Sequence, residues 1–288
     1  MSVHYSGCLA MTLLAGLLAG SQPALGQASG AAANDPAGLV TNKVLTVAIK
    51  DYSISGLVTH LPQAKVFKYG IALFPGAPGI MKVRDEAGQP RFELGGNFLI
   101  RSRRHWLDEE TLILSIDAPS DQWAGFSQWF RQDSRYGADV AALLAEASHR
   151  YAVTDWTLVG TSEGSISAFH AARMNPALAQ RLILTSSLFL AAGHGPGLSG
   201  VSWEDLTVKL LWVHHEDDGC RFTPYGIAKK HAEKTRAPLV TVRGGAPGRG
   251  PPCEAFSQHG FVGIERDTIL AMRSWVKTGV TPADVAPQ

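Results

Sequence analysis

Residues 155–174 read DWTLVGTSEGSISAFHAARM, and this stretch decides the fold. Its first six residues form an apolar run typical of a buried strand, and residues 163–174 have the composition of a helix. The turn between them, Gly160-Thr161-Ser162-Glu163-Gly164, matches the pattern G-x-S-x-G. This order predicts a sharp strand-to-helix turn that lifts the Ser162 hydroxyl clear of a sheet. The alternative is an ordinary glycine-rich turn in which Ser162 only caps the helix.

Strands and helices alternate on both sides of this stretch. Hydrophobic patterning predicts strands over 43–50, 69–74, 111–116, 155–160, 181–186, 207–213 and 238–243, and helices over 96–106, 136–151, 163–174, 226–236 and 264–277. This alternation predicts an α/β fold, with a mostly parallel central sheet and helices on both faces. No linker interrupts the pattern, so we expect residues 40–288 to form a single domain.

The N-terminal residues have the features of an export signal. Residues 9–20 (LAMTLLAGLLAG) form an apolar run that fits a signal-peptide core and is too short to span a bilayer. Small residues follow, so we expect a signal peptide over 1–26 and a short Ala/Gly/Ser-rich tether over 27–39. A buried N-terminal helix is the alternative. We therefore expect a periplasmic or secreted protein with no stable membrane anchor after cleavage.

The overall composition excludes several classes of protein. The 288 residues carry 26 Lys+Arg against 25 Asp+Glu, and no run of five or more basic residues occurs. This balance gives no electrostatic basis for binding nucleic acid. With 45% hydrophobic and 18% charged residues, the chain is also unlike a disordered protein.

On the motif around Ser162 and the order of its strands, the chain resembles the α/β-hydrolase family over roughly residues 65–278. That family places a serine nucleophile on this turn, an acid after a later strand and a histidine last. The resemblance implies that Asp218, in HHEDDGC at 214–220, is the acid, with Asp217 as the alternative. It implies that His259, in the loop before the last helix, is the general base.

The segment from His214 to Asp218 also offers two histidines and three carboxylates to a metal ion. Consecutive residues of a strand point to opposite faces, however, so His214 and His215 are poorly placed to share one ion. We therefore expect no metal site and no cofactor.

The resemblance also implies an oxyanion hole. The backbone N–H of Glu163 is the first donor, and the loop after the strand at 69–74 should supply the second, from Ala77 or else Gly76. The family commonly has His-Gly in this loop, where this chain has Pro75-Gly76. A plain Pro/Gly turn without a role is the alternative.

Two aromatic residues are candidates for a substrate pocket. Trp123 and Phe126 lie in residues 118–130, after a strand that ends at the catalytic edge of the sheet. They line an acyl pocket or pack on the core, and the sequence favours neither. The segment over 190–203, where the family often places a cap, is short.

Export would leave two cysteines, Cys220 and Cys253, in an oxidising compartment, and we expect them to form a disulfide. Two unrelated buried thiols are the alternative. Because Cys220 follows Asp218 and Cys253 precedes His259, a bridge would connect the acid loop to the base loop.

Together these features predict an exported serine hydrolase that cleaves an ester or related acyl bond of a small-molecule substrate through an acyl-enzyme. A peptidase or an acyltransferase with the same three residues is the second hypothesis. An exported ligand-binding protein without turnover is the third.

Overall fold

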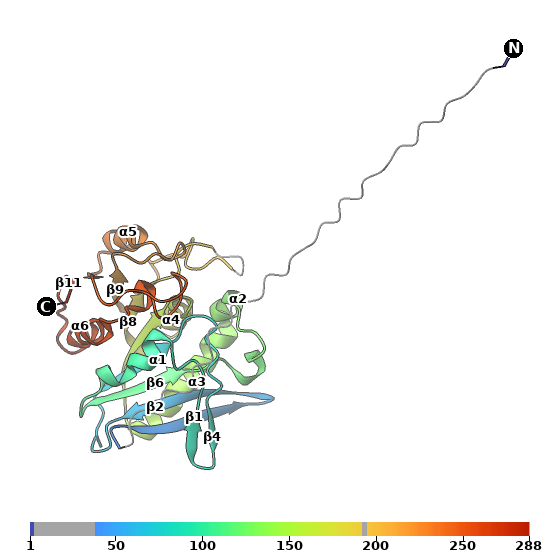
Figure 1. Ribbon diagram of the computed structural model, residues 1–288. Coiled ribbons are helices and arrows are strands. Elements are labelled where there is room, and N and C mark those ends of the chain that lie inside the picture. Colours follow the sequence, from blue (N-terminus) through green and yellow to red (C-terminus); the bar gives the residue numbers. More distant parts are fainter. Residues whose placement is uncertain (3–37, 192–194, 288) are drawn as a thin grey trace.

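The computed structural model describes residues 1–2, 38–191 and 195–287 (Figure 1). The predicted signal peptide and tether therefore lie almost entirely outside the described residues. Within those ranges, no helix is long and apolar enough to cross a membrane.

A large mixed sheet forms the centre of the fold. Nine strands of the described chain join it in the order β1-β2-β6-β3-β7-β8-β9-β10-β11. The pairs β1·β2 and β2·β6 are antiparallel, and every pair from β6 to β11 is parallel. The bounds are β1 Thr41–Ile49, β2 Tyr52–His60, β3 Tyr69–Phe74, β6 Thr111–Ile116, β7 Asp155–Thr161, β8 Ala179–Thr185, β9 Lys209–His215, β10 Leu239–Val242 and β11 Asp284–Val285. A separate hairpin pairs β4 Arg84–Glu86 with β5 Gln89–Arg91.

Helices cover both faces of the sheet, as Figure 1 shows. One face packs against α3 (Ser134–Tyr151), α4 (Gly164–Met174) and α5 (Tyr225–Thr235). The other packs against α1 (Phe98–Ser102), the 3-10 helix η1 (Arg103–Trp106) and α6 (Glu265–Thr278). The short helix α2 (Gln128–Gln132) precedes α3. The predicted α/β fold with a mostly parallel sheet is confirmed.

Successive side chains of a strand point to opposite faces of the sheet, so each central strand contributes to two hydrophobic cores, one on each face. In β6, Leu112 and Leu114 pack with the α3 and α4 side, whereas Ile113 packs with the α1 and α6 side. All three side chains are fully buried. Strands covered on both faces have no polar alternation, which is why β6 reads as a continuous apolar run.

Patterning does not predict β2, β4, β5, β11 or α2, and one predicted helix changes type along its length. Patterning does not identify β2, because its Ser, Gly and Thr residues interrupt the alternation, yet pairing with β1 and β6 buries most of it. The helix predicted over 96–106 is α-helical only as far as Ser102 and continues as a 3-10 turn to Trp106.

The strand order reverses its direction at β3. The chain runs from β3 to β6 on one side, and then crosses to β7 on the other side. Loops leaving the carboxyl ends of β3 and β7 therefore diverge at this point. In open α/β sheets such a switch point is where ligands bind.

Candidate active site

Ser162 occupies a strained turn at the carboxyl end of β7. Its φ is +53°, in the left-handed region that non-glycine residues rarely adopt. The Ser162 N–H donates to the carbonyls of Thr185 (3.2 Å) and Ser186 (3.1 Å) at the end of β8. The Ser162 carbonyl accepts from the N–H and the hydroxyl of Ser165, at 3.0 and 2.6 Å. Four hydrogen bonds thus hold the serine in this conformation.

The two glycines of G-x-S-x-G are required by close backbone approach. A Cβ on Gly160 would lie 2.3 Å from the Gly164 carbonyl oxygen, and one on Gly164 would lie 2.0 Å from the Phe74 carbonyl oxygen. Neither contact is possible for a real side chain. The glycines therefore let α4 begin directly against β3, and this packing produces the predicted sharp turn.

His259 and Asp218 come together from different loops. His259 Nδ1 lies 3.0 Å from Asp218 Oδ2, and both side chains are buried. Asp217, the alternative acid, is exposed, and its N–H donates to the His215 ring at 3.0 Å. The structure thus places Asp218, and not Asp217, against the imidazole.

Burial alone would raise the pKa of the Asp218 carboxyl, but hydrogen bonds hold it below its usual value. These come from His259, from the Cys220 N–H (2.9 Å) and from the Thr223 hydroxyl (2.8 Å). Thr223 Oγ1 also lies 3.2 Å from His259 Nδ1. Sequence reasoning did not identify Thr223 as a partner of Asp218 and His259, because its contact with His259 joins residues 36 positions apart in the chain.

The loop that carries His259 is held from several directions. The Ser186 hydroxyl donates to the His259 carbonyl at 2.8 Å, which ties this loop to the end of β8. A Cβ on Gly260 would lie 1.9 Å from the Ala255 carbonyl oxygen, so the loop folds tightly on itself. Arg101 of α1 donates to the Gly260 carbonyl at 2.7 Å and pairs with Glu265 at 2.9 Å.

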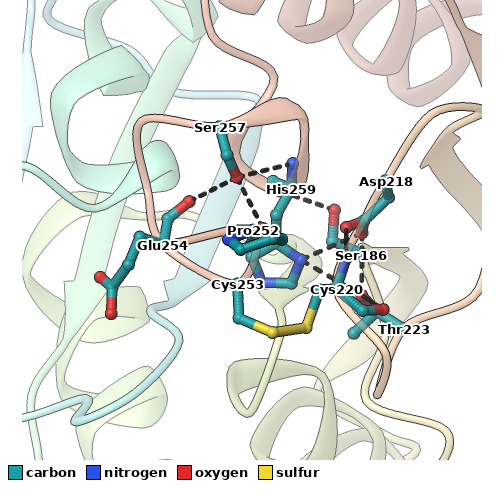
Figure 2. The surroundings of a disulfide bond; sticks show 9 residues. All are labelled: Ser186, Asp218, Cys220, Thr223, Pro252, Cys253, Glu254, Ser257 and His259. Carbon is teal, nitrogen blue, oxygen red and sulfur yellow. Dashed lines mark hydrogen bonds and ion pairs between the residues drawn. A yellow bond between two sulfur atoms is a disulfide. The ribbon is translucent and has the colours of Figure 1, made fainter. Parts of the chain in front are cut away.

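The predicted disulfide is present between Cys220 and Cys253, whose Cα atoms lie 4.6 Å apart. Figure 2 shows it beside the His259 ring, with Asp218 and Thr223 on the Cys220 side. The bridge therefore links the loop of Asp218 directly to the loop of His259.

A small cavity of about 40 Å³ lies at the centre of this arrangement. Its lining residues come from the loop after β3, the start of α1, the end of β7 and the loop that carries His259: Gly76, Ala77, Asn97, Phe98, Thr161, Ser162, Cys253, Ala255, His259 and Gly260. Ser162 and His259 thus share one cavity, although no hydrogen bond joins them. Within the described chain, His259 Nε2 is buried without a hydrogen-bond partner.

The residues predicted for the oxyanion hole are also grouped here. Gly76 and Ala77 line the cavity, and Glu163 precedes the first residue of α4, where backbone N–H groups lack acceptors within the helix. A Cβ on Gly76 would lie 3.0 Å from Ser162 Cβ, so the loop after β3 touches the serine turn.

Trp123 and Phe126 do not line this cavity. Phe126 packs against Tyr136 and Phe130 with ring centroids 5.1 and 5.9 Å away, and Trp123 Nε1 donates to the Ala118 carbonyl at 3.1 Å. Of the two roles that the sequence left open, the structure places both residues in core packing.

His214 and His215 point to different partners. Nε2 of His214 accepts from the Ser187 N–H at 3.2 Å, whereas Nε2 of His215 lies 2.9 Å from the Gly244 carbonyl. In the part of the chain that is described, no three His, Cys, Asp or Glu residues are grouped as metal ligands.

The mostly parallel sheet, its helices on both faces and the serine turn at the switch point define the α/β-hydrolase fold. No family model and no curated protein sequence matches the chain. The chain is similar in structure to an α/β serine hydrolase homologue from Coxiella burnetii, with a TM-score of 0.52, 14% identity, and coverage of 84% of this chain and 98% of that one.

Two further similarities extend the range of activities found on this fold. A dienelactone hydrolase-like promiscuous phosphotriesterase from metagenomic libraries gives a TM-score of 0.55 at 14% identity, covering 83% of this chain and 98% of that one. Oligopeptidase B from Trypanosoma brucei gives 0.55 at 13% identity, covering 85% of this chain and 38% of that one. These similarities establish the fold, which hosts many reactions.

Proposed function

We propose that this protein is a serine hydrolase that cleaves a carboxylic ester, or a related acyl bond, through an acyl-enzyme. Ser162 is the nucleophile, His259 the general base and Asp218 the acid that orients it. The proposal is carried by one observation: His259 is bound to Asp218 through Nδ1, while its buried Nε2 has no partner among the described residues and the ring lines the cavity of Ser162.

In this mechanism, Ser162 Oγ attacks the substrate carbonyl carbon while His259 Nε2 takes the hydroxyl proton. The tetrahedral intermediate then expels the alcohol, which receives that proton from His259. Water attacks the acyl-enzyme in the same way, and releases the carboxylic acid and free Ser162. Asp218 remains ionised throughout and stabilises the imidazolium.

The developing oxyanion requires fixed donors, whose individual removal costs roughly 3–4 kcal/mol of transition-state stabilisation. We assign this role to the Glu163 N–H and to the loop N–H of Ala77 or Gly76. Both positions adjoin Ser162, one in sequence and one through the contact with Gly76.

Intact-mass analysis after treatment with a fluorophosphonate tests the nucleophile. We expect one adduct on the wild-type protein and none on Ser162→Ala, with the exposed Ser274→Ala as a control that still reacts. A folded wild-type protein that remains unlabelled would contradict the mechanism and favour a ligand-binding protein without turnover.

A second experiment identifies the reaction type. Ester and amide substrates with the same acyl group separate an esterase from a peptidase, and an added alcohol acceptor reveals acyl transfer.

We also propose that the protein is exported. The apolar run over 9–20 supports this, and so does the Cys220–Cys253 disulfide, because such bonds persist in oxidising compartments. The mass of the mature chain should show cleavage near residues 24–28. An intact N-terminus in the cytoplasmic fraction would overturn this assignment.

A further inference from the structure

The cavity beside Ser162 is small compared with ordinary ligand sites. Its volume is about 40 Å³, whereas pockets for drug-sized molecules measure roughly 300–1,000 Å³. Since one water needs about 10–15 Å³ on this measure, the cavity has room for about three or four atoms the size of a water molecule. An acetyl group has this size.

The cavity walls belong to well-packed parts of the structure. Phe98 is 1% exposed, and its ring packs 4.7 Å from that of Phe261. The backbone of Gly260 is held by Arg101, and Cys253 is tied to Cys220. A longer acyl chain that stays within the cavity would have to displace close-packed groups, which is costly in a protein interior.

The cavity also has a polar end. Asn97 Oδ1 accepts from the Leu99 N–H at 3.1 Å, where it caps α1, so its Nδ2 is the free end of the amide. Asn97 lines the cavity together with Gly76 and Ser162. A carbonyl group bound in this cavity can therefore accept a hydrogen bond from the Asn97 amide while its carbon faces Ser162.

We propose that this cavity binds the acyl group of the substrate, limits it to about acetyl size, and receives its carbonyl oxygen beside Asn97. The inference rests on the proposed function and deepens it: the substrate class is short-chain esters, chiefly acetyl esters. The alcohol half then lies outside the cavity, and the cavity sets no limit on its size.

The test is a series of p-nitrophenyl esters that share a leaving group, namely acetate, butyrate and octanoate. We expect kcat/KM for the acetate, corrected for reactivity toward hydroxide, to exceed that for the butyrate about tenfold or more. Octanoate should be slower still. Equal or faster turnover of butyrate or octanoate would overturn the inference.

A variant that enlarges the cavity tests the cause of the selectivity. Phe98→Leu should raise the butyrate-to-acetate ratio about fivefold or more, because it shortens one cavity wall. Phe169→Leu is the matched control: it alters a fully buried phenylalanine of the other core, outside the cavity lining, and should leave the ratio unchanged. An unchanged ratio in folded Phe98→Leu would contradict the assignment of this wall.

The result also separates the two proposals. If the fluorophosphonate labels Ser162 but all three esters are turned over at similar rates, the acetyl-size limit is wrong and the proposed serine hydrolase activity still stands. An unlabelled serine and no turnover of any ester overturn both.

Discussion

Arg131 Nη2 lies 3.5 Å from a carboxylate oxygen of Glu163, and the Arg131 side chain is only 1% exposed. The same nitrogen donates to the Pro78 carbonyl at 3.0 Å, and Gln128 Nε2 donates to the other Glu163 oxygen at 3.0 Å. One buried cation therefore connects the loop after β3 with the residue that follows Ser162. These are the two segments to which we assign the oxyanion donors.

Arg131→Met should destabilise the protein and slow the reaction. It leaves the largely buried Glu163 carboxylate without its cation, which typically costs about 3–5 kcal/mol. We also expect kcat to fall about tenfold or more, because a small misplacement near the reacting atoms has large effects on rate. Urea unfolding and ester kinetics measure the two effects. The double variant Arg131→Met/Glu163→Gln should recover part of the stability, and strictly additive losses would show that the pair is not coupled.

Thr223→Val should lower kcat about tenfold, with little change in KM. The substitution keeps the shape of the side chain but removes the hydroxyl that donates to Asp218 at 2.8 Å, and a hydrogen bond to a charged group contributes about 1.5–3 kcal/mol. Thr223→Ser restores the hydroxyl and should restore most of the rate. If Ser and Val variants are equally slow, packing rather than the hydrogen bond explains the loss.

Loss of the disulfide should lower activity before it unfolds the protein. A bridge with a sequence separation of 33 residues contributes about 4 kcal/mol in the chain-entropy model. It also holds the loops of Asp218 and His259 together. We expect Cys220→Ser/Cys253→Ser, and reduction of the wild type, to reduce turnover under conditions where circular dichroism is unchanged. Turnover that is the same with and without reductant contradicts a role in positioning.

The Asn97 side chain caps α1 through its oxygen, and we propose that its Nδ2 donates toward the cavity. Asn97→Asp should separate these two contributions. The carboxylate can still accept the Leu99 N–H and cap α1, so the free energy of unfolding should remain close to that of the wild type. The donor toward the cavity is lost, and we expect kcat/KM for an acetyl ester to fall about 10- to 100-fold. Unchanged kinetics in Asn97→Asp would exclude the amide as a carbonyl donor.

His214 should make the fold sensitive to acid. Burial lowers the pKa of this imidazole to about 3, whereas the unfolded chain titrates near 6.5. Below pH 6.5 the unfolded state therefore binds the proton more strongly, and stability falls as pH decreases toward 3. Between pH 7 and 5 the expected loss from this residue is about 2 kcal/mol.

Urea unfolding at pH 7 and pH 5 checks this linkage. His214→Gln keeps an acceptor for the Ser187 N–H but cannot be protonated, so its stability should change less between the two pH values. A pH dependence identical to that of the wild type would contradict the assignment.

Local patterning was sufficient for most of the secondary structure. The apolar runs at 69–74 and 111–116 coincide with β3 and β6, because strands buried on both faces must be apolar throughout. The serine turn was also predictable from the sequence. Its backbone packs so closely that only glycine fits at positions 160 and 164, and this leaves the G-x-S-x-G pattern. β2 was not predicted, because its own pattern is interrupted and its burial also depends on pairing with β6, which is distant in sequence.

The sequence by itself determined the α/β fold, the serine turn and the pair of cysteines, because periodicity, glycine and composition act over short stretches of chain. Only the tertiary structure decided that Asp218 rather than Asp217 meets His259, that Trp123 and Phe126 pack in the core, and which side chains support the site. The physical reason is that the roles we propose for Asn97, Thr223 and Arg131 depend on segments far along the chain, which meet them only in the folded protein. Such contacts leave no periodic trace in the sequence, and exist only once the sheet has brought its loops together.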